Sequence, residues 1–187
     1  QALPARMKPD QSNNVSSTKN WPGLTSLNTL IIRVDKCDFG IKSTPIEYSG
    51  RTFFPKREAH ITVLGSDLGT HLQQQFTNNR LVEQQVKQAF ESTDWCYTKT
   101  HDLRHLVREN NDLPGLDKTE ESIIMRLEMG GMAEFYTKLK RLGLIHKDHP
   151  VPPPHVTLYT RNCDLGIGVH SETELIKLTS EHIDKPV

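Results

Sequence analysis

Two segments of the chain combine an imidazole with a hydroxyl at the same spacing. They read His60-Ile61-Thr62-Val63-Leu64 and His155-Val156-Thr157-Leu158-Tyr159. In a β-strand, side chains two positions apart share a face, so each histidine would lie beside its threonine, with apolar residues on the other face. Two such segments arise by chance in roughly one sequence of this composition in 200. The pair is therefore informative, although either segment alone is more typical of a structural strand histidine.

If the two strands lie together, two imidazoles and two hydroxyls converge on one surface. A neutral imidazole can accept a proton from an attacking water, and an imidazolium can donate one to a leaving oxygen. The hydroxyls of Thr62 and Thr157 can donate hydrogen bonds to phosphoryl oxygens as negative charge builds on them. This set favours phosphoryl transfer without a metal, and it contains no covalent nucleophile. Residue types alone leave open which of His60 and His155 is the base.

The elements that must position these groups follow from hydrophobic periodicity. Apolar and β-branched runs predict strands at 29–34, 51–54, 60–64, 95–98, 102–108, 122–129 and 155–160. Apolar residues at helical spacing predict amphipathic helices over 80–92 and 131–142. The prolines of 150–154 bring an extended chain into the second motif, and Ser171 with Glu174 forms a capping box that begins a short last helix.

The first 28 residues differ from the rest of the chain. Residues 1–28 are rich in Ser, Asn, Pro and Lys without periodicity, which predicts a flexible polar leader or a strap laid over the surface. Residues 29–187 are expected to form a single domain in two lobes. The chain begins with Gln1, so we expect it to be processed or trimmed, and Asn14-Val15-Ser16 fits a glycosylation sequon, a short pattern that often arises by chance.

The composition excludes several classes of protein. The chain has 23 basic and 23 acidic residues, a formal net charge of zero, whereas an extended nucleic-acid surface needs a large positive excess. No apolar run approaches the roughly 20 residues that cross a bilayer, so we expect no membrane contact. We further expect a monomer in the cytoplasm. Cys37, Cys96 and Cys163 lie far apart and indicate neither a disulfide framework nor a zinc ribbon.

With both motifs and the order of elements in view, the chain resembles the 2H phosphoesterase superfamily over about residues 29–160. That superfamily has two His-x-Thr/Ser motifs and includes RNA 2′,3′-cyclic phosphodiesterases. The resemblance implies a bilobal α+β fold, in which two antiparallel sheets line a central cleft and helices cover the outer faces. It implies His60 and His155 as the acid and base pair, Thr62 and Thr157 as phosphate ligands, and no metal or other cofactor. Residues 154–160, with Gly166-Ile167-Gly168 and the Ser171 cap, most resemble the branch of Swiss-army-knife RNA-repair-like proteins.

Further residues are candidates for contacts with the substrate. Tyr159 should share the Thr157 face of its strand, where it could stack on a base or bond a phosphoryl oxygen. Arg126 lies in the middle of a predicted strand, and it could reach a phosphate or pair with an acid nearby. Lys56 and Arg57 precede the first motif and could meet a phosphate or face water.

The remaining histidines and glycines have ordinary explanations. His101 and His105 are four residues apart, as metal ligands on a helix would be, but no third ligand has a suitable spacing. His146 and His149 are expected to be solvated loop residues. Gly166-Ile167-Gly168 could form a phosphate-binding turn, although an ordinary turn is the default.

These observations predict a metal-independent phosphodiesterase that hydrolyses the 2′,3′-cyclic phosphate of a nucleotide or RNA end. A 2′-5′ linkage, a cyclic oligonucleotide or ADP-ribose 1″,2″-cyclic phosphate would suit the same groups. A non-catalytic module that binds RNA ends or nucleotides is the alternative from another class. The zero net charge favours a small substrate or a strand terminus over a long polyanion.

Overall fold

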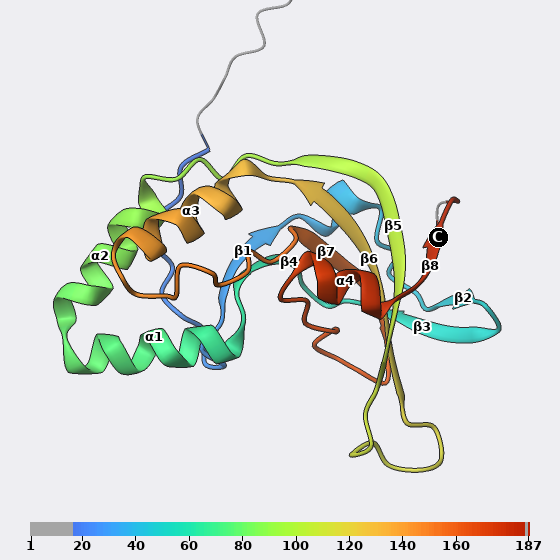
Figure 1. Cartoon of the computed structure of the whole chain (residues 1–187). Helices are drawn as coiled ribbons and strands as arrows, with labels where there is room; N and C mark the ends of the chain where they lie inside the picture. The colour runs from blue at the N-terminus through green and yellow to red at the C-terminus, as the bar shows by residue number, and fades with distance from the viewer. Residues whose placement is uncertain (1–16, 186) are drawn as a thin grey trace, which may run out of the picture.

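The fold is built on one curved antiparallel sheet, seen in the computed structural model of residues 17–185 and 187 (Figure 1). Its strands are β1 (Leu30–Val34), β2 (Ile46–Tyr48), β3 (Arg51–Pro55), β4 (Ala59–Leu64), β5 (Thr98–Glu109), β6 (Thr119–Glu128), β7 (His155–Arg161) and β8 (Thr179–Ile183). The main order is β1-β4-β7-β6-β5-β8. β3 pairs with the C-terminal part of β7 and forms a hairpin with β2.

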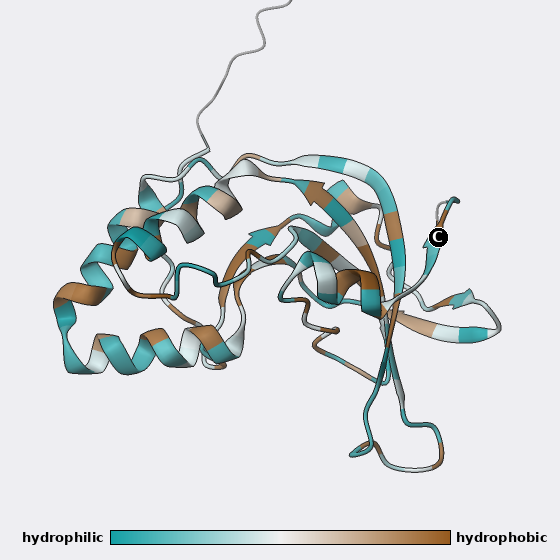
Figure 2. Cartoon of the chain, viewed as in Figure 1, coloured by the Kyte–Doolittle hydropathy of each residue, from teal (hydrophilic) through white to brown (hydrophobic). Residues whose placement is uncertain are grey.

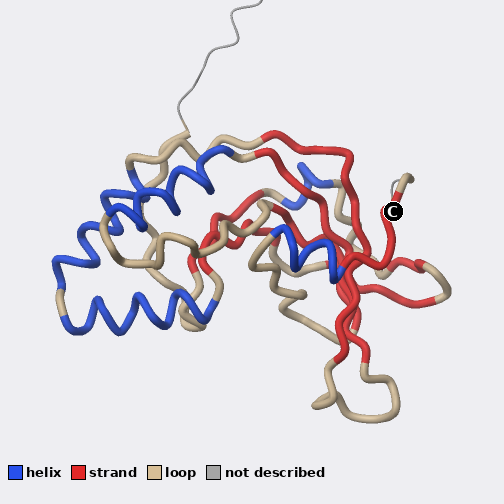
Figure 3. Tube along the Cα trace, in the orientation of Figure 1, coloured by secondary structure: helices blue, strands red, loops and turns tan. Residues whose placement is uncertain are grey.

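Helices lie on both faces of this sheet. They are α1 (Ser66–Asn78), α2 (Arg80–Glu91), α3 (Gly130–Arg141) and α4 (Glu172–Leu178), and a short 3₁₀-helix, η1, spans Lys36–Phe39. The first three gather at one end of the molecule (Figure 3) and share the larger hydrophobic core with Ile123 of β6. α4 packs against Ile124 in a second, smaller core. Because successive residues of a strand point to opposite faces, α4 covers the face that α1–α3 leave open.

The larger core holds the first motif strand in place. Phe90, Trp95 and Phe135 form an aromatic cluster, with ring centroids 4.9 Å apart for Phe90 and Trp95 and 5.5 Å apart for Trp95 and Phe135. The buried hydroxyl of Tyr136 on α3 donates a hydrogen bond to the carbonyl of Val63 on β4, at 2.7 Å. Hydrophobic residues gather on the central strands, whereas the outer faces of the helices are mostly hydrophilic (Figure 2). Helix α3 therefore fixes the depth and orientation of β4.

The sequence predicts α2 and α3 correctly but misses α1. Asn79 caps α2 through a hydrogen bond from the Leu81 amide, and the buried residues of both helices recur at helical spacing. The large buried side chains of α1 are only Leu72 and Phe76, in a run rich in Gln, Thr and Asn. So weak an apolar stripe does not identify a helix from sequence alone. Packing against α2 stabilises α1 in the folded chain.

Several strands also differ from the sequence prediction. β2 and β3 form a hairpin across Ser49 and Gly50, both of which have positive φ, as a two-residue hairpin turn requires. β5 is one strand with an irregularity between Lys99 and Leu103, where we predicted two strands. β8 has no sequence signal of its own and is formed by pairing with β5.

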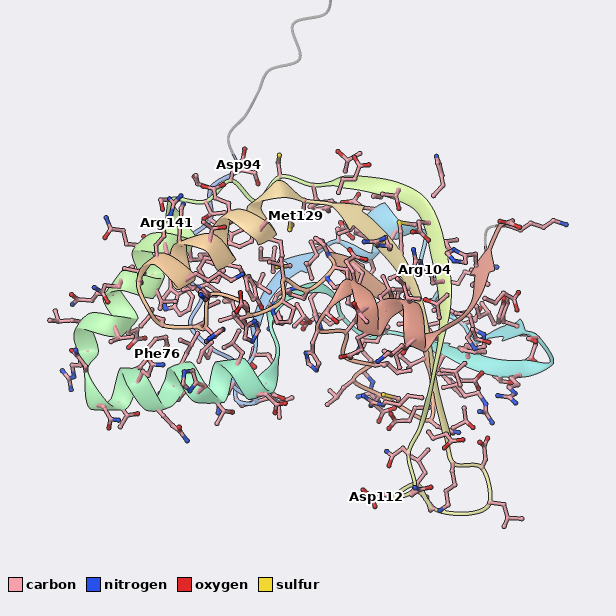
Figure 4. The ribbon with its side chains drawn as sticks, in the orientation of Figure 1. Phe76, Asp94, Arg104, Asp112, Met129 and Arg141 are labelled. Carbon is pink, nitrogen blue, oxygen red and sulfur yellow. The ribbon has the colours of Figure 1, made fainter. Side chains whose placement is uncertain are left out.

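The predicted fold class is confirmed as α+β, but the predicted pair of sheets is not observed. The strand ladder continues without a break from β1 to β8, because β4 pairs with β7 through Ile61 and Val156. The two motif strands are therefore neighbours within one sheet. The long hairpin of β5 and β6 leaves the body of the molecule, with Asp112 near its tip (Figure 4). Among the described residues, no helix has both the length and the apolar character needed to cross a membrane.

The N-terminal segment is a strap wherever the structure describes it. Residues 1–16, which include the Asn14 sequon, lie outside the described residues, so the expectation for 1–28 can be compared with the structure only at 17–28. The Ser17 carbonyl accepts a hydrogen bond from the Trp95 amide at 3.0 Å. The Trp21 ring packs edge-on against Phe90, with centroids 5.6 Å apart. These contacts tie the strap to α2 and to the core.

We predict that the strap and α1 depend on the absence of a side chain at Gly69. A Cβ at this position would lie 1.5 Å from the Asn28 carbonyl oxygen, so Gly69→Ala must push the strap away from the helix. We expect a loss of about 1–3 kcal/mol in the free energy of unfolding, measured by denaturant titration. Gly130→Ala is the matched control, because nothing lies within 4 Å of its Cβ and alanine should stabilise α3 slightly. Equal stability of the two variants would contradict this close approach.

Candidate active site

The pairing of β4 with β7 brings the two His-x-Thr motifs onto one face. Ile61 is paired with Val156 in this antiparallel ladder, and both side chains are fully buried. Antiparallel pairing places His60 opposite Thr157 and, on the other side of the apolar pair, Thr62 opposite His155. Cross-strand partners share a face, so all four polar groups lie on the face opposite Ile61 and Val156. We call this the motif face. Each of the four is partly exposed, as a ligand-binding group must be.

Charged side chains surround His60. Its Nδ1 lies 3.4 Å from Glu58 Oε1 and, although buried, makes no hydrogen bond within the described residues. Arg33 is the cross-strand partner of His60, and its Nη1 pairs with Glu58 Oε2 at 2.9 Å. Burial lowers the pKa of the His60 imidazole, the Lys56 charge lowers it further, and the Glu58 carboxylate opposes both. The neutral imidazole is thus the favoured form, and the Glu58 carboxylate stabilises the imidazolium once a proton binds.

A backbone carbonyl orients His155. His155 Nδ1 lies 2.8 Å from the Pro153 carbonyl oxygen. A carbonyl can only accept, so Nδ1 carries the proton and Nε2 of the neutral ring holds the free lone pair. Burial lowers the pKa of His155, the Pro153 carbonyl opposes this shift, and the charges of His60 and Arg126 lower the pKa further. The dependence of one imidazole on the charge of the other places both in one electrostatic site.

Arg126 lies beside this site and is paired with acids. It is the cross-strand partner of His155 on β6. Its guanidinium pairs with Glu172 at the start of α4, and its Nη1 lies 3.8 Å from Asp102 Oδ2. Arg104, labelled in Figure 4, donates two hydrogen bonds to the same Asp102. The predicted pairing of Arg126 with an acid is confirmed, whereas its contact with a phosphate stays a prediction.

The segment between β7 and α4, residues 162–171, returns over the motif face. Gly166, with φ of 84°, lies so close to Thr157 that a Cβ would be 3.2 Å from the threonine Oγ1. The Ile167 amide donates a hydrogen bond to Ser122 Oγ at 3.1 Å, and Lys56 Nζ donates one to the Asp164 carbonyl at 2.8 Å. The Gly166-Ile167-Gly168 turn thus packs against a motif threonine. The Ser171 hydroxyl accepts a hydrogen bond from the Glu174 amide, so the predicted N-cap at Ser171 is confirmed.

Sequence reasoning missed two residues near the motifs, Glu58 and His170. Glu58 gave no motif signal, although its position two residues before His60 would place both on one face of an extended chain. Lys56 is a candidate from the sequence, and the structure adds that this residue is buried. His170 lies against Gly65 at the end of β4, since a Cβ on that glycine would be 3.3 Å from His170 Cε1. Nothing in the local sequence connects His170 to β4, because the contact depends on the path of the 162–171 segment.

The structure corrects the prediction for Tyr159. Thr157 pairs with Ile124 but Tyr159 pairs with Ile123, so β7 contains an extra residue, Leu158, at this point. Such a β-bulge breaks the alternation of side chains and turns Tyr159 away from the Thr157 face. Tyr159 is 1% exposed, and its hydroxyl accepts a hydrogen bond from the Lys42 amide at 2.8 Å. It is a core residue and does not line the motif face.

The other histidines singled out in the sequence lie outside the site. His105 is buried, with Nε2 2.8 Å from Glu121 Oε1, while His101 is exposed on the same strand. His146 is exposed, and His149 packs against the ring of Tyr136 at 6.0 Å. Within residues 17–185 and 187, no group of three or more His, Cys, Asp or Glu side chains is arranged to hold a metal ion.

Two surface hollows lie away from the histidines. One, of about 680 Å³, is lined by Trp21 and by residues of α1 and α2. The other, of about 520 Å³, lies between the strap and β1. Neither includes His60 or His155. We therefore identify the candidate site by the polar groups of the motif face and the register of their strands, and not by a surface hollow.

Comparisons with known proteins identify no family for this chain. No protein-family model matches the chain, and neither a curated protein nor a solved structure matches it.

We predict opposite shifts in the pKa of His60 when its charged neighbours are removed. Glu58→Gln removes the carboxylate that favours the imidazolium, so the pKa should fall. Lys56→Met removes a nearby cation, so the pKa should rise. Proton NMR titration of the His60 ring measures both shifts. Arg57→Met, which removes an exposed charge next to Lys56, is the control; if it moved the pKa as far as Lys56→Met, the effect of Lys56 would not be local.

We also predict a structural effect of Tyr159→Phe. The variant loses the hydrogen bond from the Lys42 amide, which should cost about 1 kcal/mol in the free energy of unfolding. Affinity for inorganic phosphate, measured by calorimetry, should be unchanged, because the side chain does not reach the motif face. A marked loss of phosphate affinity at unchanged stability would instead indicate that Tyr159 contacts the phosphate.

Proposed function

We propose that this chain is a metal-independent phosphodiesterase of the 2H phosphoesterase type, which hydrolyses the 2′,3′-cyclic phosphate of a nucleotide or RNA end. The observation that carries the proposal is the pairing of Ile61 with Val156. It sets two imidazoles and two threonine hydroxyls on one face, in two cross-strand pairs. A binding site for one tetrahedral phosphate between two proton-transfer groups needs just these types of residue.

The proposed reaction is an in-line displacement at phosphorus. Water attacks the cyclic phosphate while one imidazole accepts its proton, and a bond from phosphorus to a ribose oxygen breaks. The other imidazole, present as imidazolium, donates its proton to that oxygen, so the product is a nucleotide or RNA end with a 2′- or 3′-phosphomonoester. Thr62 and Thr157 would donate hydrogen bonds to the non-bridging oxygens, which gain negative charge in the transition state.

We assign the base role to His155 and the acid role to His60. The Nδ1 hydrogen bond to Pro153 leaves Nε2 of neutral His155 free to accept a proton. At His60, the Glu58 carboxylate raises the pKa against burial and the Lys56 charge, and so supports the imidazolium that an acid needs. With the pKa of both histidines below the usual imidazole value, the bell-shaped profile of kcat/KM should be displaced toward acid pH.

In this proposal the substrate lies in a cleft over the motif face. The parts of the sheet on either side of the contact between β4 and β7 would correspond to the two lobes of the superfamily. The 162–171 segment, which already packs against Thr157, would form one wall. Both motifs come from one chain, so a monomer would suffice. The zero net charge supports a nucleotide or short RNA end as substrate.

The test is hydrolysis of a substrate panel by matched variants. We expect His60→Ala and His155→Ala each to lower kcat/KM by roughly 100-fold to 10,000-fold, because each removes a proton-transfer group. His146→Ala, an exposed histidine on another loop, should keep full activity. Turnover should be unaffected by EDTA.

The panel should contain cyclic nucleotides, RNAs with cyclic phosphate ends, 2′-5′ linked oligonucleotides, cyclic oligonucleotides and ADP-ribose 1″,2″-cyclic phosphate. Full activity in either catalytic variant would refute the two-histidine mechanism. Tight binding without turnover of any substrate would instead favour a non-catalytic module that recognises RNA ends or nucleotides.

A further inference from the structure

Lys56 is a buried cation beside the motif face. The residue is 9% exposed, and Nζ donates one hydrogen bond, to the carbonyl of Asp164 at 2.8 Å. Within the described part of the chain, no carboxylate oxygen lies within 4.0 Å of this ammonium. An ammonium has three donors, so one acceptor leaves two of them unused.

Burial of such a group is unfavourable unless an anion balances it. Desolvation of a charged side chain costs several kcal/mol, and a single backbone carbonyl does not return this energy. Burial accordingly lowers the pKa of Lys56, because it disfavours the charged form of the amine. The other two cations near the histidines differ, since Arg33 pairs with Glu58 and Arg126 with Glu172. Lys56 alone among these three lacks a direct ion pair, since the Glu58 and Asp164 carboxylates act on it only from beyond 4.0 Å.

The backbone and the 162–171 segment place Lys56 next to the motif groups. The Lys56 amide donates a hydrogen bond to the carbonyl of Leu158, the residue after Thr157. The Asp164 carbonyl that holds Nζ and the Gly166 that contacts Thr157 belong to one short turn, closed by a hydrogen bond from Gly166 N to the Cys163 carbonyl. On the other side, the charge of Lys56 acts directly on the pKa of His60. The ammonium therefore lies against the turn that packs on Thr157, and its charge acts on His60.

We propose that Lys56 is the charged ligand of the phosphate, and that its two unused N–H groups contact a non-bridging oxygen. This inference rests on the proposed function for the identity of the substrate. One fixed positive charge matches the single negative charge of a phosphodiester, since the neighbouring arginines are already neutralised. The site thus selects phosphodiesters by charge, in addition to the threonine hydrogen bonds. A purely structural role, in which Lys56 only ties down Asp164, is the alternative.

The experiment measures the affinity of the full chain for inorganic phosphate by calorimetry. We expect Lys56→Met and Lys56→Gln to weaken binding about 10-fold or more, because each removes a charge-assisted hydrogen bond. Arg57→Met removes an exposed charge from the next residue and should change affinity less than twofold. Phosphate should raise the melting temperature of the wild type and have little effect on either Lys56 variant. Unchanged phosphate affinity in both Lys56 variants would overturn the proposal.

The outcome is separable from that of the proposed function. A chain with both His60→Ala and His155→Ala should lack hydrolysis and still bind phosphate, and adding Lys56→Met should abolish that binding. If the wild type hydrolyses no substrate while phosphate binding still requires Lys56, the phosphodiesterase proposal fails and the anion site stands. If hydrolysis occurs with the same kcat/KM in Lys56→Met as in the wild type, Lys56 is not a phosphate ligand. A Lys56→Met variant that melts lower and binds phosphate normally identifies the structural role.

Discussion

The contact between β4 and β7 is the constraint on which the rest of the structure depends. Ile61 and Val156 meet across these strands and are fully buried, in the core that α1, α2 and α3 complete. Because the side-chain period of a strand is two, burial of this pair forces the flanking His and Thr side chains to the other face. A slip of one residue would bury the histidines and expose the apolar pair. The hydrophobic core therefore selects the register that assembles the candidate site.

A local irregularity of β7 separates a residue of the motif face from a residue of the core. The bulge at Leu158 ends the alternation, so that Thr157 stays on the motif face while Tyr159 enters the core. Beyond the strand, the chain turns back through Gly166, whose lack of a side chain permits its contact with Thr157. The same return brings the Asp164 carbonyl to Lys56. One short segment thus shapes the surroundings of both motifs.

Charges elsewhere in the molecule are balanced where they are buried. Glu121, which is 1% exposed, accepts hydrogen bonds from Arg51 and Arg161 and lies 2.8 Å from His105 Nε2. A buried carboxylate with such partners needs no ligand, since the desolvation cost is offset by charge-assisted hydrogen bonds. Lys56 differs because its single acceptor is a neutral carbonyl. The contrast within one fold is the physical reason to expect an anion at Lys56 and none at Glu121.

Local sequence determined much of the secondary structure. Apolar runs define the motif strands, and strong apolar stripes define α2 and α3, because these signals are complete within a few residues. α1 and β8 escaped prediction, since their stability comes from contacts with α2 and β5. The types of catalytic candidate, two histidines and two threonines, were likewise readable from the sequence alone.

Only the tertiary structure decided how these residues meet. The continuous sheet, the pairing of Ile61 with Val156, the bulge that removes Tyr159 and the burial of Lys56 join segments far apart in the chain. Strand periodicity states which face a residue takes, but not which strand lies next to it. That choice depends on how the whole chain buries its apolar surface, and for this reason the sequence specified the chemistry of the site while the fold set its geometry.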